Sequence, residues 1–299
     1  MSSTAQFRRR IKSINNTKQI TRAMQMISSI KMQKATKKIQ DSRAYIQNAW
    51  NILAKLTKMS LPSDHLLLSS PVKATKIAVI LVSSDRTLCG SYNSDIFKRY
   101  LRFIKENISQ GKAIENVDVI AIGKRGADFV KKNNLGNIIA EFNGFENGVN
   151  FDQIIPISKL SNDEYLNKKY KKVVAIYSHF ESLISHLPVA KQILPIVDSH
   201  IDEARLWQDT DQSKADYTYE PDAILIIETI LSQIVRTQIY GAILEGNASE
   251  QSARMLAMQN ATDNAQNLIK ELTLLYNTVR QNSITAEISE IANAAEAMK

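Results

Sequence analysis

The segment with the clearest potential for chemistry is Gly123-Lys124-Arg125-Gly126, which follows the apolar run 118–122. A glycine-rich turn between a strand and a helix is a common phosphate site, because backbone N–H groups at the helix N-terminus bind anions. The spacing G-x-x-x-x-G-K-[ST] is absent here, and G-x-G-x-x-G occurs nowhere in the chain. We therefore expect a plain strand-to-helix turn, in which glycine supplies a positive φ.

A second group of reactive types is Ser83, Ser84 and Asp85 ahead of Cys89. A nucleophile needs a base beside it, but no histidine lies nearby in the sequence and no G-x-S-x-G elbow is present. Cys89 is therefore predicted to be a buried thiol that packs as a small apolar residue. A single cysteine excludes an internal disulfide, and the four histidines have no metal-ligand spacing, so no metal or cofactor is expected.

Positive charge is concentrated at the N-terminus. Residues 1–60 hold 13 Lys or Arg against one acid, Asp41, whereas residues 61–220 hold 20 of each sign and residues 221–299 have a net charge of −4. Such a segment can bind nucleic-acid phosphates or an acidic protein surface. A recognition module is missing and the aromatic residues of the segment are few, so we expect no nucleic acid, although a coiled-coil nucleic-acid binder stays an alternative.

The helix breakers divide the chain into three parts. All six prolines and seven of the nine glycines lie between Pro62 and Pro221, and only Gly241 and Gly246 follow. The predicted domains are an N-terminal coiled-coil helix (1–60), an α/β domain (61–220) and a C-terminal coiled-coil helix (221–299).

Both terminal segments have helical periodicity. The predicted apolar stripe of the first consists of Ile20, Ala23, Met24, Ile27 and Ile30. The last segment has spacings of three and four at Met255, Met258, Thr262, Ala265, Ile269, Leu272, Tyr276 and Val279. A seven-residue repeat predicts a left-handed coiled coil, in which methionines pack along the seam. Helices of this length would measure about 90 and 115 Å, so we expect the two chain ends to pair with each other as an antiparallel coiled coil.

The middle of the chain alternates between strand and helix patterns. Short β-branched runs occur at 76–83, 118–122 and 173–177, with a further candidate strand at 192–197, and helical stretches occur at 94–107 and 127–132. The predicted fold class is α/β, with a Rossmann-like domain and a mostly parallel sheet attached to the coiled coil. Apolar runs such as 77–82 are far shorter than the roughly 20 residues that cross a bilayer, and the start resembles no secretory signal, so a soluble chain in a reducing, cytoplasmic setting is expected.

Three strings in these segments are specific to a known family. They are IKSINNTKQITRAMQMISSIKMQKA (11–35), DRTLCGSYN (85–93) and NASEQSARMLAMQNATDNAQNLIKELTLLYNTVRQNSITAEISE (247–290). The chain resembles the γ subunit of bacterial and mitochondrial F-type ATP synthases, and Tyr219-Glu220-Pro221-Asp222 looks like the start of that family's long C-terminal helix.

The resemblance implies a rotor and no catalysis. It implies a central shaft inside a hexamer of three α and three β subunits, which couples ion flow through the membrane sector to ATP synthesis or hydrolysis on β and regulates that activity. Further implied partners are the ε subunit and the ring of c subunits, at the cytoplasmic face of the bacterial inner membrane, with the chain held there as a peripheral protein through the complex.

The same resemblance assigns contact residues. Met24, Arg280, Gln281, Thr285 and Glu290 would face β, Arg22, Lys31 and Lys34 would meet an acidic lever of β, and Tyr219 and Glu220 would lie near the c ring and ε. The residues alone leave a second alternative, a small α/β enzyme whose helical arms mediate oligomerisation.

Overall fold

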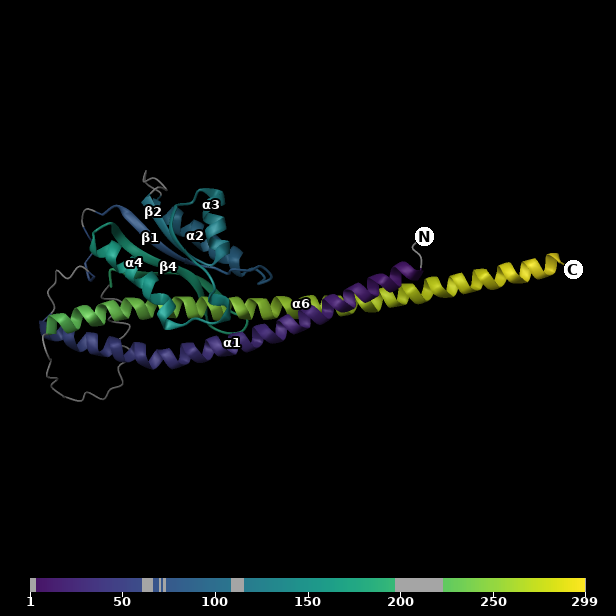
Figure 1. Cartoon of the computed structure of the whole chain (residues 1–299), viewed down its shortest axis with the longest axis horizontal. Helices are drawn as coiled ribbons and strands as arrows, with labels where there is room; N and C mark the ends of the chain where they lie inside the picture. The colour runs from purple at the N-terminus through teal and green to yellow at the C-terminus, as the bar shows by residue number, and fades with distance from the viewer. Residues whose placement is uncertain are drawn as a thin grey trace. The chain divides into compact units, whose positions relative to one another are not determined.

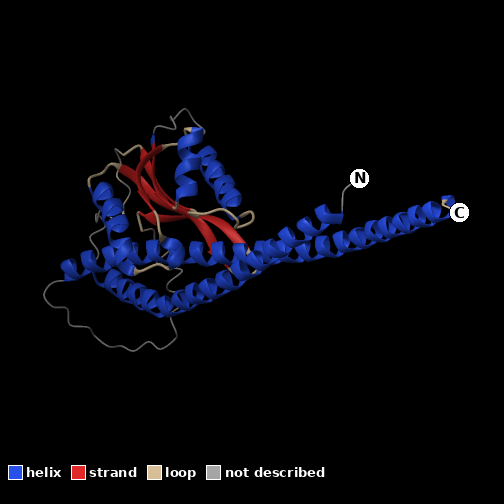
Figure 2. Cartoon of the chain, turned by 45° about the vertical axis from the view of Figure 1, so that its right-hand side comes forward, coloured by secondary structure: helices blue, strands red, loops and turns tan. Residues whose placement is uncertain are grey.

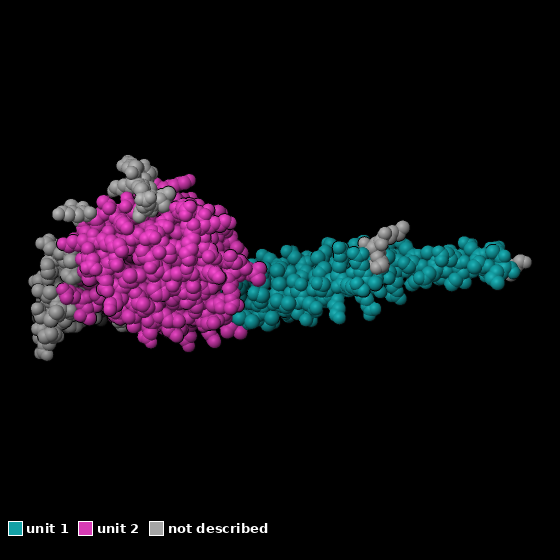
Figure 3. All heavy atoms as spheres, turned by 45° about the horizontal axis from the view of Figure 1, so that its top comes forward, with its two compact units in different colours: residues 1–29, 254–299 teal, residues 30–253 magenta. Residues whose placement is uncertain are grey.

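The computed structural model describes residues 4–60, 67–69, 71, 74–108, 116–196 and 223–298, and it describes side chains outside 43–47, 50–60 and 223–227. Two long helices, α1 (Thr4–Ser60) and α6 (Ala223–Ala297), contribute to both of its compact units. One unit consists of residues 1–29 and 254–299, and the other of residues 30–253 (Figure 3).

The first unit is a two-stranded antiparallel coiled coil. Figures 1 and 2 show α1 and α6 side by side and running in opposite directions within it. On α6 the predicted seam is confirmed, because its members are buried or half-buried, and from Ala265 to Val279 each lies between exposed neighbours. Thr21 of α1 and Thr262 of α6 meet in the middle of the seam, with their hydroxyl oxygens 2.8 Å apart.

The predicted apolar stripe of α1 was wrong. Ile20, Ile27 and Ile30 are 60, 53 and 54% exposed, and Met24 is half-buried. In the coiled-coil part of α1, protected positions recur at spacings of four and three: Phe7, Ile11, Ile14, Lys18, Thr21, Gln25 and Ser28. Within residues 4–29 the buried places are taken by the small polar side chains of Thr21 and Ser28, because small residues let two helices approach closely.

The second unit contains a five-stranded sheet in the order β3-β2-β1-β4-β5. Its strands are β1 (Lys76–Val82), β2 (Val117–Ile122), β3 (Asn137–Phe142), β4 (Tyr170–Phe180) and β5 (His186–Leu194). Strands β1 to β4 are parallel and β5 is antiparallel to β4, which confirms the α/β class and the mostly parallel sheet. Residues 192–194 of the candidate strand 192–197 are the end of β5, residues 195 and 196 follow it, and residue 197 lies outside the described residues. Strand β3 and helix α4 (Ile155–Leu166) were not predicted.

Both faces of the sheet are covered by helices, as expected for a buried parallel sheet. Ile77, Val79 and Leu81 of β1 pack towards α2 (Tyr92–Ile108) and α3 (Lys124–Asn133). The alternate residues of β1 pack in a second core with α4 and with the parts of α1 and α6 that belong to this unit. Because side chains alternate along β1, helices α2 and α3 pack on one face of the sheet, and α4, α1 and α6 pack on the other (Figure 2).

A buried carboxylate joins the beginnings of the parallel strands. Asp118 of β2 is 1% exposed and accepts hydrogen bonds from the Tyr170 hydroxyl (2.9 Å) and the Asn137 amide (3.4 Å). Lys76 and Lys169 lie 3.6 and 3.9 Å from its oxygens. Burial, followed by the hydrogen bond to Asp118, raises the pKa of Tyr170, so this hydroxyl stays a donor.

Candidate functional site

The turn at Gly123 occupies the phosphate position of a Rossmann-like sheet. Gly123 has φ 91°, as the prediction of a strand-to-helix turn required. The first amides of α3 are already bonded: Lys124 N donates to Asp85 Oδ1 (3.0 Å), and Gly126 N donates to Ser83 Oγ (2.8 Å). A carboxylate of the chain itself therefore occupies the place that a phosphate would take.

The serine and cysteine cluster forms the frame of the same turn. Cys89 is 3% exposed, which confirms the buried thiol. Asn93 Nδ2 donates to Ser84 Oγ (2.7 Å) and contacts Cys89 Sγ (3.3 Å), and Ser84 Oγ donates to the Arg86 carbonyl (2.6 Å). Residues 83–91 thus form the loop between β1 and α2, and the hydroxyls of Ser83 and Ser84 are used in backbone and amide bonds.

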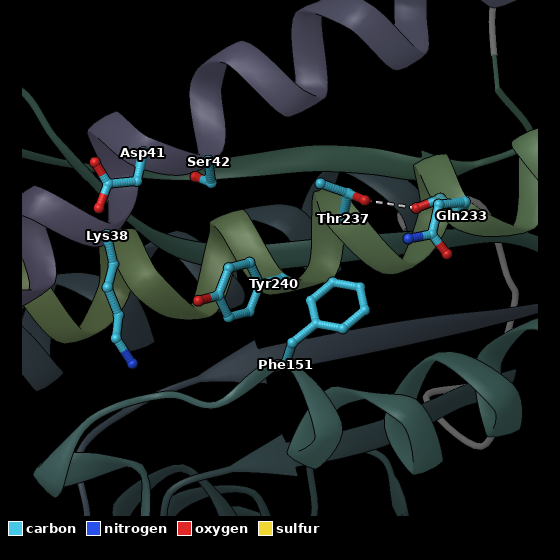
Figure 4. Close-up of a pocket in the computed structure, with 7 residues that line it drawn as sticks. All are labelled: Lys38, Asp41, Ser42, Phe151, Gln233, Thr237 and Tyr240. Atoms are coloured by element: carbon cyan, nitrogen blue, oxygen red, sulfur yellow. Dashed lines mark hydrogen bonds between the residues drawn. The ribbon is translucent and has the colours of Figure 1, made fainter.

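A cavity of about 470 Å³ lies between α1, α6 and the short helix η3 (Phe151–Ile154) within the α/β unit (Figure 4). Phe151 and Tyr240 form its aromatic wall, with ring centroids 5.4 Å apart in a T-shaped arrangement. Burial raises the pKa of Tyr240, so its hydroxyl is neutral. The Lys38 ammonium donates to the Val149 carbonyl (2.7 Å), so the basic group of this cavity already serves the protein's own backbone.

The contact residues assigned to α1 have different environments. In the coiled-coil unit Arg22 is exposed and Met24 is half-buried. In the α/β unit Lys34 is exposed, whereas Lys31 Nζ donates to Asn147 Oδ1 (2.9 Å). The assigned residues Tyr219 and Glu220 lie outside the described residues.

The contact residues assigned to α6 are all exposed: Arg280, Gln281, Thr285 and Glu290. Gln281 and Thr285 lie one turn apart, and the Thr285 hydroxyl donates to the Gln281 carbonyl (3.0 Å). The guanidinium of Arg280 and the amide of Gln281 can therefore form directional hydrogen bonds with another protein.

An apolar stripe beside these residues was missed by sequence reasoning. Ile284, Ile288 and Ile291 are 43, 62 and 69% exposed. Their spacing of four and three residues places them on one face of α6. This periodicity is present in the sequence, but it lies beyond Val279, where the predicted seam ends.

Among the described residues there is no group of three or more His, Cys, Asp or Glu side chains placed to hold a metal ion. None of the described helices combines the length and apolar character of a membrane span.

The paired chain ends and the five-stranded body define a coiled-coil protein with a Rossmann-like α/β domain. A family model described as ATP synthase matches residues 3–298. Similar curated proteins are the ATP synthase gamma chains of Nitrosomonas eutropha, 36% identical with complete coverage of both chains, and of Roseiflexus sp. strain RS-1, 38% identical over 100% of this chain and 99% of the relative. This chain belongs to the ATP synthase gamma chain family.

Solved structures agree at the level of the fold. A chain of the Euglena gracilis mitochondrial ATP synthase, in a structure of OSCP, F1 and c-ring, matches with a TM-score of 0.65 at 16% identity, covering 99% of this chain and 94% of that one. A chain of the Tetrahymena thermophila mitochondrial ATP synthase central stalk and c-ring matches with a TM-score of 0.57 at 22% identity, covering 81% and 99%.

Proposed function

We propose that the chain is the rotating central shaft of an F-type ATP synthase, which couples ion flow through a membrane sector to ATP synthesis or hydrolysis and regulates that activity. The observation that carries the proposal is the coiled coil of the two chain ends in a member of the gamma chain family. A coiled coil suits a shaft because its backbone hydrogen bonds are internal and its interlocked seam resists shear.

The chemistry belongs to other subunits in this proposal. ATP is made or hydrolysed on β, and this chain is a non-catalytic part of the complex. The occupied turn at Gly123 supports this division, because Asp85 and Ser83 already bind the amides that would bind a phosphate.

Coupling arises from the uneven surface of the shaft. Each rotor angle presents a different set of side chains to each β subunit, so the free-energy difference between open and closed β states changes with the angle. Met24, Arg280, Gln281, Thr285 and Glu290 are the proposed contacts with β. The exposure of the four α6 residues is compatible with such a contact.

The basic part of α1 has a second role in the proposal. Arg22, Lys31 and Lys34 attract an acidic lever of β. Exposed charges act over about a Debye length of 8–10 Å and have little directional preference, so they attract without fixing one rotor angle.

The three sequence segments take different parts. Segments 1–60 and 221–299 form the shaft, and segment 61–220 forms the body that connects to the ε subunit and the c ring, with Tyr219 and Glu220 close to them. The proposed location is the cytoplasmic face of the bacterial inner membrane, where the complex of three α and three β subunits and the c ring holds the chain as a peripheral subunit.

The experiment is co-expression with α and β followed by a coupling assay in membrane vesicles. Arg280→Glu combined with Thr285→Ala should leave assembly intact and lower ATP-driven ion pumping about fivefold or more, the scale of a typical coupling free energy. The matched control is Lys270→Glu with Thr273→Ala, which likewise reverses a positive charge and removes a threonine hydroxyl at exposed positions of α6. Unchanged pumping in the test variant would count against the assigned contacts, and failure to co-purify with α and β would overturn the shaft.

A further inference from the structure

Residues 143–151, the first part of the segment between β3 and α4, are tied to the loop that follows β1. We call these residues the bridging loop. Gly144 N donates to Asp85 Oδ2 (2.9 Å), and Glu146 forms an ion pair with Arg86 (2.9 Å). Asp85 uses its other oxygen on the first amide of α3, so one carboxylate fixes the bridging loop to the sheet and to a helix.

The bridging loop also binds α1. Lys31 Nζ donates to Asn147 Oδ1 (2.9 Å), and Lys38 Nζ donates to the Val149 carbonyl (2.7 Å) and lies 3.5 Å from Asn150 Oδ1. The two lysines are seven residues apart, so they lie on one face of α1 two turns from each other. The loop therefore holds α1 at two points along its axis.

On its other side the bridging loop binds α6. The Asn247 amide donates to the Phe145 carbonyl (2.6 Å) in a buried hydrogen bond, and the Phe151 ring packs edge-on against Tyr240. Tyr240 and Asn247 are again seven residues apart and share one face of their helix. All these contacts lie within the unit of residues 30–253.

We infer that the bridging loop is the joint through which the α/β body drives both helices of the shaft, with Lys38 of α1 and Asn147 of the loop as its coupling residues towards α1. The apolar core between sheet and helices resists separation but is non-directional, so it opposes sliding weakly. Hydrogen bonds are directional, and those with a charged donor are the stronger ones. When the body turns, these bonds carry the shear force to α1.

This inference rests on the proposed function, and torsional stiffness tests it in the assembled complex. The α and β subunits are immobilised, a bead is attached to the body through Asp128→Cys, and the angular variance of the bead is recorded in the paused motor. Asp128 is exposed, whereas Cys89, the single cysteine of the chain, is 3% exposed, so the introduced thiol is the one that reacts.

The test variant combines Lys38→Met with Asn147→Ala, which removes both side chains of the joint and keeps Lys31. We expect the angular variance to rise at least about twofold, because the directional bonds to α1 are lost. The matched control combines Lys37→Met with Asn143→Ala. Lys37 is an exposed α1 lysine, and Asn143 of the bridging loop donates to Glu141 of β3 and not to α1. The control should keep the variance of the parent.

Rescue separates coupling from folding. Lys38→Arg keeps a donor for the Val149 carbonyl and should restore the stiffness, whereas Lys38→Met alone should raise the variance and serves if the double variant fails to assemble. If the angular variance is equal in the parent and Lys38→Met complexes and ATP hydrolysis is intact, the proposed role of the bridging loop is wrong, whereas the proposed function as a rotating shaft is unaffected. A parent chain that does not assemble with α and β, or does not rotate, would overturn the shaft and the joint together.

Discussion

Gly123 is a position where the backbone and its neighbours both exclude a side chain. Its φ is 91°, and a Cβ built there would lie 2.2 Å from the Ser83 carbonyl oxygen. Gly144 offers a matched control, because its φ is 92° but a Cβ would meet nothing within 4 Å. We expect Gly144→Ala to cost about 1–2 kcal/mol from backbone strain and Gly123→Ala about 3 kcal/mol or more, since the clash adds to the strain. Denaturant unfolding of the full chain measures both, and equal costs would contradict the clash.

Asp118 is the residue whose loss should most disturb the start of the sheet. Asp118→Ala leaves the buried Tyr170 hydroxyl without its acceptor, so we expect the free energy of unfolding to fall by about 2–4 kcal/mol. Tyr170→Phe removes the donor and leaves Asp118 near Lys76 and Lys169, so it should cost about 1–2 kcal/mol. A larger loss in Tyr170→Phe than in Asp118→Ala would contradict this order.

Residue-scale prediction succeeded where local chemistry decides the outcome. Gly123 and Cys89 were predicted from their types and neighbours, because a positive φ and a buried thiol are local properties. The role of Asp85 was not, since its partners Lys124 and Gly144 are about 40 and 60 positions away along the chain. Local sequence patterns do not predict hydrogen bonds between a carboxylate and the turn that follows another strand.

At the scale of elements, the sequence predicted the α6 side of the coiled-coil seam but not the α1 side. The α6 half carries apolar residues such as Met258, Ala265 and Leu272, so periodicity of hydrophobic residues located it. The α1 half buries Thr21 and Ser28 and exposes isoleucines, so the same method chose the outer face. Hydrophobic periodicity therefore fails where close approach of two helices requires small side chains.

The hydroxyl pair in the seam can be tested by a double-mutant cycle. Thr21→Val and Thr262→Val conserve shape, so we expect a coupling free energy of about 1 kcal/mol, the net value of one hydrogen bond. Thr17 lies one turn earlier on α1, is exposed and donates to its own helix at Ser13. The cycle of Thr17→Val with Thr262→Val should therefore show coupling within about 0.3 kcal/mol of zero. Similar coupling in both cycles would show that the seam hydrogen bond contributes nothing specific.

At the scale of the whole molecule, class was easier to predict than connectivity. The positions of glycine and proline separated the helical ends from the α/β middle, and β-branched runs located β1, β2 and β4. Strand β3 was missed because its side chains are only half-buried at the sheet edge, so its pattern is weakly apolar. The antiparallel direction of β5 follows from the short hairpin after β4, since a parallel return needs a long crossover.

The exposed stripe of α6 leads to a prediction about assembly. Ile284, Ile288 and Ile291 contribute little to the isolated chain because they are exposed, and serine has a helix propensity close to that of isoleucine. Replacing all three with serine should therefore change the free energy of unfolding by less than about 0.5 kcal/mol. Burial of one such side chain contributes roughly 1.5–3 kcal/mol. If the surrounding α and β subunits bury the stripe, the triple variant loses a fraction of this binding free energy at each position, and the complex should dissociate about tenfold faster or more.

Leu272→Ser is the matched control for this experiment. Leu272 lies in the seam and is 8% exposed, so its substitution should cost the isolated chain about 2–4 kcal/mol. Chemical denaturation of the isolated chain and the dissociation rate of the immobilised complex together separate the two effects. If the triple variant dissociates from the complex as slowly as the parent, the three isoleucines remain exposed to water after assembly. Only burial of this face in the complex would make the dissociation rate depend on its isoleucines.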